Sequence, residues 1–174
     1  MINKQEEEKL LQKFEHIADQ LSDQGYAIVD SFLETHQVHD LLEVLTTNKA
    51  LGTFKKAGIG SADRVVVDKE VRGDYIHWIE PSEASPPTQV FLDHMNEIMR
   101  YLNRTCFLGL KDYEFHFTLY PPGTVYQRHI DQFKESDHRR LSFICYLNED
   151  WLPEHGGELR LYLPQPDGSE EQVD

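Results

Sequence analysis

The sequence Y-P-P-G-T-V-Y-Q-R-H-I-D, residues 120–131, is the stretch around which we expect the fold of this chain to be organised. It ends in His129 and Asp131, which are two positions apart. On a β-strand, residues i and i+2 point to the same face. If residues 126–131 form a strand, the imidazole and the carboxylate converge on one point, as a pair of metal ligands would.

Such a pair supplies two corners of the 2-His-1-carboxylate facial triad, which holds non-haem Fe(II) and leaves coordination positions open. The third corner should be a later histidine, and after Asp131 the sequence contains only His138 and His155. His155 lies in a predicted loop before two glycines, so we do not expect it to serve as a replacement ligand. Because an H-x-D match is short and recurs by chance, the flanking segments must support the assignment.

Composition indicates one globular domain: the chain has 174 residues, of which 39% are hydrophobic. The N-terminus is charged and no apolar run approaches the length of a membrane span, which predicts a cytoplasmic protein with no membrane partner. A net charge of −14 with scattered Lys and Arg disfavours a nucleic-acid partner. Cys106 and Cys145 lack the spacing of a zinc or redox site and are expected to be buried free thiols.

Apolar residues at helical spacing predict three helices, over 6–24, through the segment from Val38 to Leu45, and over 88–103. His36 and His39 are placed i, i+3 and could bind a metal, but a solvated helix face is favoured because no carboxylate or thiol completes a site nearby in the sequence. His94 is interpreted as a partly exposed helix residue rather than a ligand.

The second half of the chain has the period of two that is typical of strands, most clearly from Tyr113 to Leu119. His116 lies on the polar row of that strand and points into a polar cavity or into solvent. Further strands are predicted over 26–29, 64–67, 75–79, 126–131, 140–147 and 158–163, with a long glycine-containing loop over 50–63. Helices first and short strands afterwards indicate an α+β fold, a jelly roll whose β core (about 113–163) is buttressed by an N-terminal helical part (about 1–105).

Several segments match one family in order and in approximate spacing. They are V-R-G-D-Y-I-H-W-I-E (71–80), Tyr120-Pro121, Y-Q-R-H-I-D (126–131), Arg139, C-Y-L-N-E-D-W (145–151) and G-G-E-L-R (156–160). With these segments the chain resembles the Fe(II)/2-oxoglutarate-dependent dioxygenases of the prolyl 4-hydroxylase type, which include the hypoxia-inducible-factor prolyl hydroxylases and their bacterial relatives. The resemblance implies a cupin-like double-stranded β-helix.

The resemblance also implies the residues of an active site. His129 and Asp131 would be the iron ligands and the catalytic centre. Tyr120, Tyr146 and Leu159 would line the 2-oxoglutarate pocket, with the Tyr146 hydroxyl on a carboxylate of the co-substrate and Leu159 in the apolar wall. Ordinary packing is the alternative interpretation of both tyrosines.

Five residues would contact the substrate by the same resemblance: Arg72, Asp74, Trp78, Tyr126 and Arg139. We expect an Asp74–Arg139 salt bridge that closes over a bound peptide, and Trp78 packed under the neighbouring loop. A plain surface turn is the alternative for Arg72 and Asp74.

The activity implied is 4-hydroxylation of a prolyl residue with 2-oxoglutarate and O2, with ascorbate as a reductant of the iron. The partner would be a protein that presents a proline in a loop or an extended segment, and a translation elongation factor is the candidate if the chain is bacterial. The alternatives are an oxygenase acting on a free small molecule, and a non-catalytic cupin-like binding domain. Sequence alone predicts no oligomeric state.

The C-terminal part departs from the family. Beyond Leu163 the family has further strands that carry the second iron histidine and an arginine for the far carboxylate of 2-oxoglutarate, whereas residues 164–174 here resemble a hairpin loop with nothing on its far side. We therefore expect a C-terminally truncated chain with an open sheet edge and impaired binding of iron and co-substrate.

Overall fold

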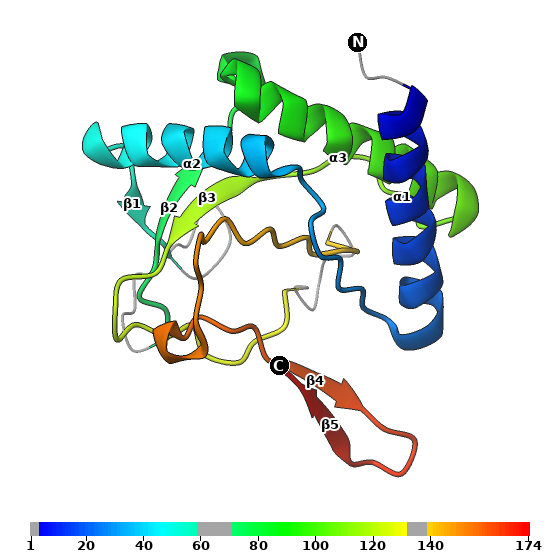
Figure 1. The fold of residues 1–174 in the computed structure, drawn as a ribbon. Coiled ribbons are helices and arrows are strands. Elements are labelled where there is room, and N and C mark those ends of the chain that lie inside the picture. Colours follow the sequence, from blue (N-terminus) through cyan, green and yellow to red (C-terminus); the bar gives the residue numbers. More distant parts are fainter. Residues whose placement is uncertain (1–3, 59–70, 132–138) are drawn as a thin grey trace.

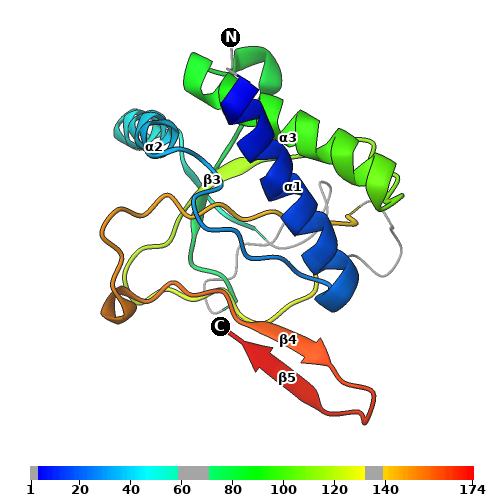
Figure 2. The same cartoon turned by 45° about the vertical axis from the view of Figure 1, so that its right-hand side comes forward.

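The structure is a computed structural model that describes residues 4–58, 71–131 and 139–174. Three long helices lie on one side of the molecule, and the small hairpin β4–β5 projects at the end away from them (Figures 1 and 2). The helices are α1 (Lys4–Gln24), α2 (Thr35–Ala50) and α3 (Pro86–Thr105). These bounds confirm the three helices that the apolar spacing predicts.

Each helix has a local reason for its ends. Gly25 ends α1 with a φ of 81°, which costs glycine little, and its N–H bonds to the carbonyl of Leu21. The Gln37 side chain accepts a hydrogen bond from the Glu34 backbone N–H and caps the start of α2. Pro86 occupies the first turn of α3, where its missing N–H costs nothing.

A three-stranded antiparallel sheet lies beside the helices, in the order β1 (Lys55–Lys56), β2 (Tyr75–Trp78), β3 (His116–Leu119). The strand predicted around 75–79 is thereby confirmed. A separate hairpin pairs β4 (Leu161–Pro164) with β5 (Glu170–Val173). Two 3-10 turns, Pro81–Glu83 and Pro153–His155, complete the regular elements of the described residues.

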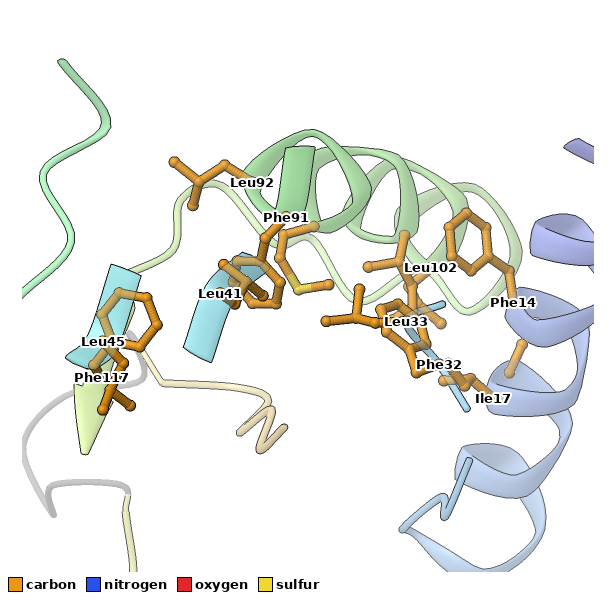
Figure 3. Close-up of a cluster of buried hydrophobic side chains, with 13 residues drawn as sticks. Phe14, Ile17, Phe32, Leu33, Leu41, Leu45, Phe91, Leu92, Leu102 and Phe117 are labelled. Atoms are coloured by element: carbon orange, nitrogen blue, oxygen red, sulfur yellow. The ribbon is translucent and has the colours of Figure 1, made fainter. Parts of the chain in front are cut away.

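The hydrophobic core lies where α3 packs against α1 and α2, with β3 at one end (Figure 3). α3 points a continuous apolar face inward, and its buried residues follow helical spacing. The apolar residues of this core are Phe14, Ile17, Ala18, Phe32, Leu33, Leu41, Leu45, Phe91, Leu92, Met95, Ile98, Leu102 and Phe117. The helices and β3 therefore share one hydrophobic core.

Several expected strands lack regular secondary structure. Residues 26–29, 126–131 and 140–147 have no assigned strand. In the first and the third of these segments apolar residues still lie against the core, among them Ala27, Val29 and Phe143, whereas Ile130 of the second is 85% exposed. In residues 26–29 and 140–147, the alternation of apolar and polar residues indicates which side chains face the core. A β-strand additionally requires a neighbouring backbone with which to form hydrogen bonds. The strand predicted over 64–67 lies outside the described residues.

The C-terminal segment also differs from its prediction. Residues 164–174 do not end as a loop with nothing on its far side, because Glu170–Val173 returns as β5 and pairs with β4. Cys106 and Cys145 are free, as predicted, but each is half-buried rather than buried. Among the described residues, no helix is both long enough and apolar enough to cross a membrane.

Candidate metal centre

His129 and Asp131 point at one another, as their spacing predicts. The imidazole Nε2 lies 3.2 Å from the Asp131 Oδ1. On the other side of the ring, Nδ1 lies 2.7 Å from the backbone carbonyl oxygen of Gln127. A carbonyl can only accept, so Nδ1 carries a proton, and Nε2 is the ring nitrogen that faces the carboxylate. The second oxygen of Asp131 accepts a hydrogen bond from the hydroxyl of Ser142.

This arrangement fits a divalent metal such as Fe(II). An unprotonated imidazole nitrogen and a carboxylate oxygen repel each other at 3.2 Å unless a proton or a cation lies between them. Neighbouring ligands of an octahedral metal are about 3 Å apart when the metal–ligand bonds are about 2.1 Å long. A histidine that binds a metal usually donates its other N–H to a backbone carbonyl or a carboxylate, as His129 does to Gln127.

Within the described part of the chain, no group of three His, Cys, Asp or Glu side chains converges as a metal site would. His155 uses its Nδ1 to accept the Leu152 backbone N–H at 3.2 Å, so that nitrogen caps its own turn. His138 lies outside the described residues. The pair of residues 129 and 131 is therefore the candidate metal-binding unit among the described residues.

Tyr126 lies directly against the imidazole. Its ring is stacked on the ring of His129, with the centroids 3.8 Å apart and the planes 20° from parallel. The guanidinium of Arg72 lies over the same tyrosine ring, 4.2 Å from its centroid. Arg72 in turn binds Asp74 through Nε to Oδ1 at 2.8 Å and through Nη2 to Oδ2 at 2.6 Å.

The expected Asp74–Arg139 salt bridge is not the pairing in this structure. The side chain of Asp74 is fully buried and both of its oxygens are bonded to Arg72. Arg139 lies 3.9 Å from Glu114 in a largely exposed ion pair. The planar fork of Arg72 already occupies both carboxylate oxygens of Asp74. The surface-turn alternative for Arg72 and Asp74 is excluded by their burial.

Trp78 and His116 form the neighbouring rim. They occupy paired positions of β2 and β3, and their rings lie 4.8 Å apart. Burial, and next the positive charge of Arg72, lower the pKa of His116. The polar row of β3 thus places a neutral imidazole against an exposed indole. Trp78, which was expected to pack under the loop over 50–63, contacts the ring of His116, and residues 59–63 of that loop lie outside the described residues.

The three residues expected around 2-oxoglutarate are each about half-exposed: Tyr120, Tyr146 and Leu159. Burial of its hydroxyl, and next the charge of Asp74, raise the pKa of Tyr120 to about 12, which keeps the phenol protonated as a donor. Burial also raises the pKa of Tyr146, whose hydroxyl donates to the Gly157 carbonyl at 3.0 Å. Hollows of about 410 Å³ beside α1 and about 70 Å³ beside α2 and α3 lie away from these three residues.

The helical histidines differ in their surroundings. His39 is exposed, which confirms the prediction that it lies on a solvated helix face. Two carboxylates are nevertheless near it, Glu43 at 3.4 Å and Glu149 at 3.7 Å. His94 is buried, and the prediction of a partly exposed residue is wrong. It falls on the core face of α3 together with Phe91 and Met95, and its Nδ1 has no hydrogen-bond partner.

Two contacts near the site could not be predicted from the sequence. Ser142 reaches Asp131 across eleven positions. Arg128 binds Glu170 of β5 through Nη1 and Nη2 and lies over the ring of Tyr162, 4.0 Å from its centroid. Both contacts join segments that are distant in the chain, and neither residue type is unusual at an exposed position.

Comparison with known proteins gives the class of this chain. A family model described as the 2OG-Fe(II) oxygenase superfamily matches residues 115–174. A Pseudomonas putida prolyl-4-hydroxylase of known crystal structure is 33% identical, with a TM-score of 0.76 over 92% of this chain and 80% of that one. A Trichoplax adhaerens prolyl hydroxylase, solved with a hypoxia-inducible-factor peptide fragment, has the same TM-score of 0.76 at 23% identity, over 99% of this chain and 78% of that one.

Curated animal proteins are also similar in sequence to this chain. Egl nine homolog 1 of human and of mouse is 28% identical over 169 residues, which is 92% of this chain and 38% and 40% of the respective relatives. The chain thus spans about two-fifths of the length of these proteins. The chain belongs to the 2OG-Fe(II) oxygenase superfamily, and within that superfamily it is of the prolyl hydroxylase type. Fe(II) and 2-oxoglutarate are the metal and the co-substrate of this family, as the sequence resemblance implies.

Proposed function

We propose that this chain is the catalytic part of a protein prolyl 4-hydroxylase, with the double-stranded β-helix of its family. The observation that carries the proposal is the convergence of the His129 Nε2 and the Asp131 Oδ1 at 3.2 Å, with the tautomer of the imidazole set by Gln127. These two atoms would hold Fe(II). When bound, the iron would supply the oxidative chemistry with O2 and 2-oxoglutarate, and ascorbate would keep it reduced.

The other residues would bind and orient. Tyr120, protonated over the whole physiological range, would donate a hydrogen bond to a carboxylate of 2-oxoglutarate. Tyr146 would exchange the Gly157 carbonyl for the same co-substrate, and Leu159 would form an apolar wall. Their half-exposed positions leave them accessible to a small dicarboxylate.

The substrate would be a peptide that presents a proline over the rim. Trp78 and Arg139 are exposed there and are the residues that could contact it directly. The side chains of Arg72, Asp74 and Tyr126 are more buried and would support the peptide-binding surface from beneath. The Pseudomonas and Trichoplax neighbours carry prolyl hydroxylase in their names, which supports a protein substrate. If the chain is bacterial, a translation elongation factor is the first candidate peptide source.

The test incubates the protein with Fe(II), 2-oxoglutarate, ascorbate and O2, with and without proline-containing peptides. We expect peptide-dependent succinate release and a mass gain of one oxygen atom on a proline. His129→Ala and Asp131→Ala should abolish both, whereas His39→Ala, an exposed histidine of α2, should not. Succinate release that ignores every peptide but responds to a small molecule would favour the free-substrate oxygenase. Failure of the protein to bind any divalent metal would favour the alternative of a non-catalytic cupin-like binding domain.

A further inference from the structure

The segment that carries the metal pair is held by few backbone contacts. Residues 126–131 form no assigned strand, and their backbone is tied to the described chain by an isolated bridge between Arg72 and Tyr126. Gln127 N–H donates to the Val71 carbonyl at 2.9 Å, and Gly73 N–H donates to the Val125 carbonyl at 3.2 Å. Side chains must therefore supply much of the rigidity that a metal ligand needs.

A layered stack provides this rigidity. Arg72 lies 4.2 Å and the His129 ring 3.8 Å from the centroid of Tyr126. Two planar groups cannot both lie so close to one ring centre on the same face without overlapping. The phenol is therefore sandwiched between the guanidinium and the imidazole, and the guanidinium fixes one face while the imidazole rests on the other.

The outer layer of the stack is itself immobile. Both oxygens of the buried Asp74 hold Arg72, and the Nη1 of Arg72 reaches the Gly58 carbonyl at 3.3 Å and the Tyr126 hydroxyl at 3.4 Å. An arginine with all these partners has lost its rotamer freedom. Its plane is set by the buried carboxylate, and the plane of Tyr126 follows from it.

We infer that Tyr126, clamped by the Arg72–Asp74 pair, is a positioning residue that fixes the imidazole plane of His129 for metal binding. The Gln127 carbonyl at Nδ1 and the Asp131 carboxylate at Nε2 hold two atoms of the ring, but the ring can still turn about the line that joins these two nitrogens. Stacking removes that remaining freedom. The inference rests on the proposed function for the identity of the metal, and the stack itself does not depend on it.

Proton NMR of the metal-free protein tests the stack. Protons over the face of an aromatic ring are shifted upfield, so the ring protons of His129 should resonate upfield of the other histidines. The double variant Arg72→Met/Asp74→Leu removes the clamp without leaving a buried unpaired charge. We expect this variant to lose the upfield shift although Tyr126 is still present. Arg104→Met is the matched control, because Arg104 also lies over a tyrosine, Tyr101, on α3 and away from the site.

Mn²⁺ titration tests the consequence for the metal. We expect the clamp variant and Tyr126→Leu to bind Mn²⁺ about 10- to 100-fold more weakly than wild type, the loss usual for a group that orients a metal ligand. Tyr126→Phe keeps the ring and should retain the affinity. Circular dichroism and a thermal melt confirm that each variant is folded.

Two results would overturn the inference: an upfield shift that survives removal of the clamp, or a shift that disappears with no change in Mn²⁺ affinity. Absence of Mn²⁺ binding by the wild-type protein would instead defeat the proposed metal centre, and the imidazole shift would still decide whether the stack exists. The failure of the inference and the failure of the proposed function are thereby distinguishable.

Discussion

The guanidinium of Arg72 and the carboxylate of Asp74, two residues apart, form a bidentate ion pair whose acidic partner is fully buried. Burial of a carboxylate is costly unless both oxygens are bonded, and the fork of Arg72 bonds both. The bond to Asp74 raises the pKa of Arg72 against the opposing effect of its own burial. The pair ties the start of β2 to the segment that carries the metal ligands.

Breaking this pair from one side should be costly. Asp74→Ala leaves Arg72, whose side chain is only 13% exposed, without its counter-ion. We expect the free energy of unfolding to fall by about 3–5 kcal/mol, as for other buried pairs that lose one partner. Urea unfolding measures this change. Glu170→Ala removes the partner of Arg128 in an exposed pair and should change stability little. Equal losses of unfolding free energy in Asp74→Ala and Glu170→Ala would contradict the conclusion that the Arg72–Asp74 pair is buried and stabilising.

Gly73 is required by a close approach. A Cβ at this position would lie 2.7 Å from the Thr124 Cβ, closer than carbon atoms can pack. Gly73→Ala should therefore push the segments that carry residues 73 and 124 apart and lower the free energy of unfolding by about 1–3 kcal/mol. In a double-mutant cycle with Thr124→Gly, the second substitution should recover part of the loss. Independent, additive effects would show that the contact carries no strain.

His94 should make stability depend on pH. Burial lowers its pKa from the usual 6.5, so the unfolded chain takes up a proton at a higher pH than the folded one. Stability is fully present above about pH 6.5 and falls as the pH drops from there toward the lower pKa of the folded state. His94→Leu should remove this part of the slope in urea unfolding followed across acidic pH. The neighbouring core substitution Met95→Leu should leave the slope as in wild type.

Two phenylalanines, one buried and one exposed, test the contribution of the aromatic cluster of Phe91, Phe115 and Phe143. Phe91 is buried and lies edge-on to Phe115, with ring centroids 5.2 Å apart, and to Phe143 at 6.4 Å. Phe91→Ala should cost about 3–5 kcal/mol of unfolding free energy. Phe107 is 85% exposed, and Phe107→Ala should have almost no effect in the same thermal or urea melts.

Tyr120 provides a test of the co-substrate site. Its raised pKa, about 12, keeps the phenol protonated, and a donor to a charged carboxylate is worth about 1.5–3 kcal/mol. Tyr120→Phe should therefore raise the KM for 2-oxoglutarate about 10- to 100-fold in the succinate assay. Tyr101→Phe alters a tyrosine of α3 and should leave KM unchanged. A normal KM in Tyr120→Phe would remove this tyrosine from the proposed pocket.

The sequence by itself determined the local features. Helical spacing identified α1, α2 and α3, and β-branched and aromatic residues identified β2. The i, i+2 spacing brought His129 and Asp131 to the same side even though residues 126–131 form no assigned strand. These features depend on neighbours within a few positions of one another, which is the range over which backbone geometry repeats.

Tertiary structure alone decided the partners. Arg72 rather than Arg139 binds Asp74, Ser142 orients Asp131, and His94 is buried with an unpartnered nitrogen. Residues 140–147 show the division clearly: alternation places Phe143 and Cys145 against the core, yet no strand pairing follows. The physical reason is that burial, ion pairing and strand pairing depend on which distant segments approach in space, and periodicity along the chain carries no information about that approach.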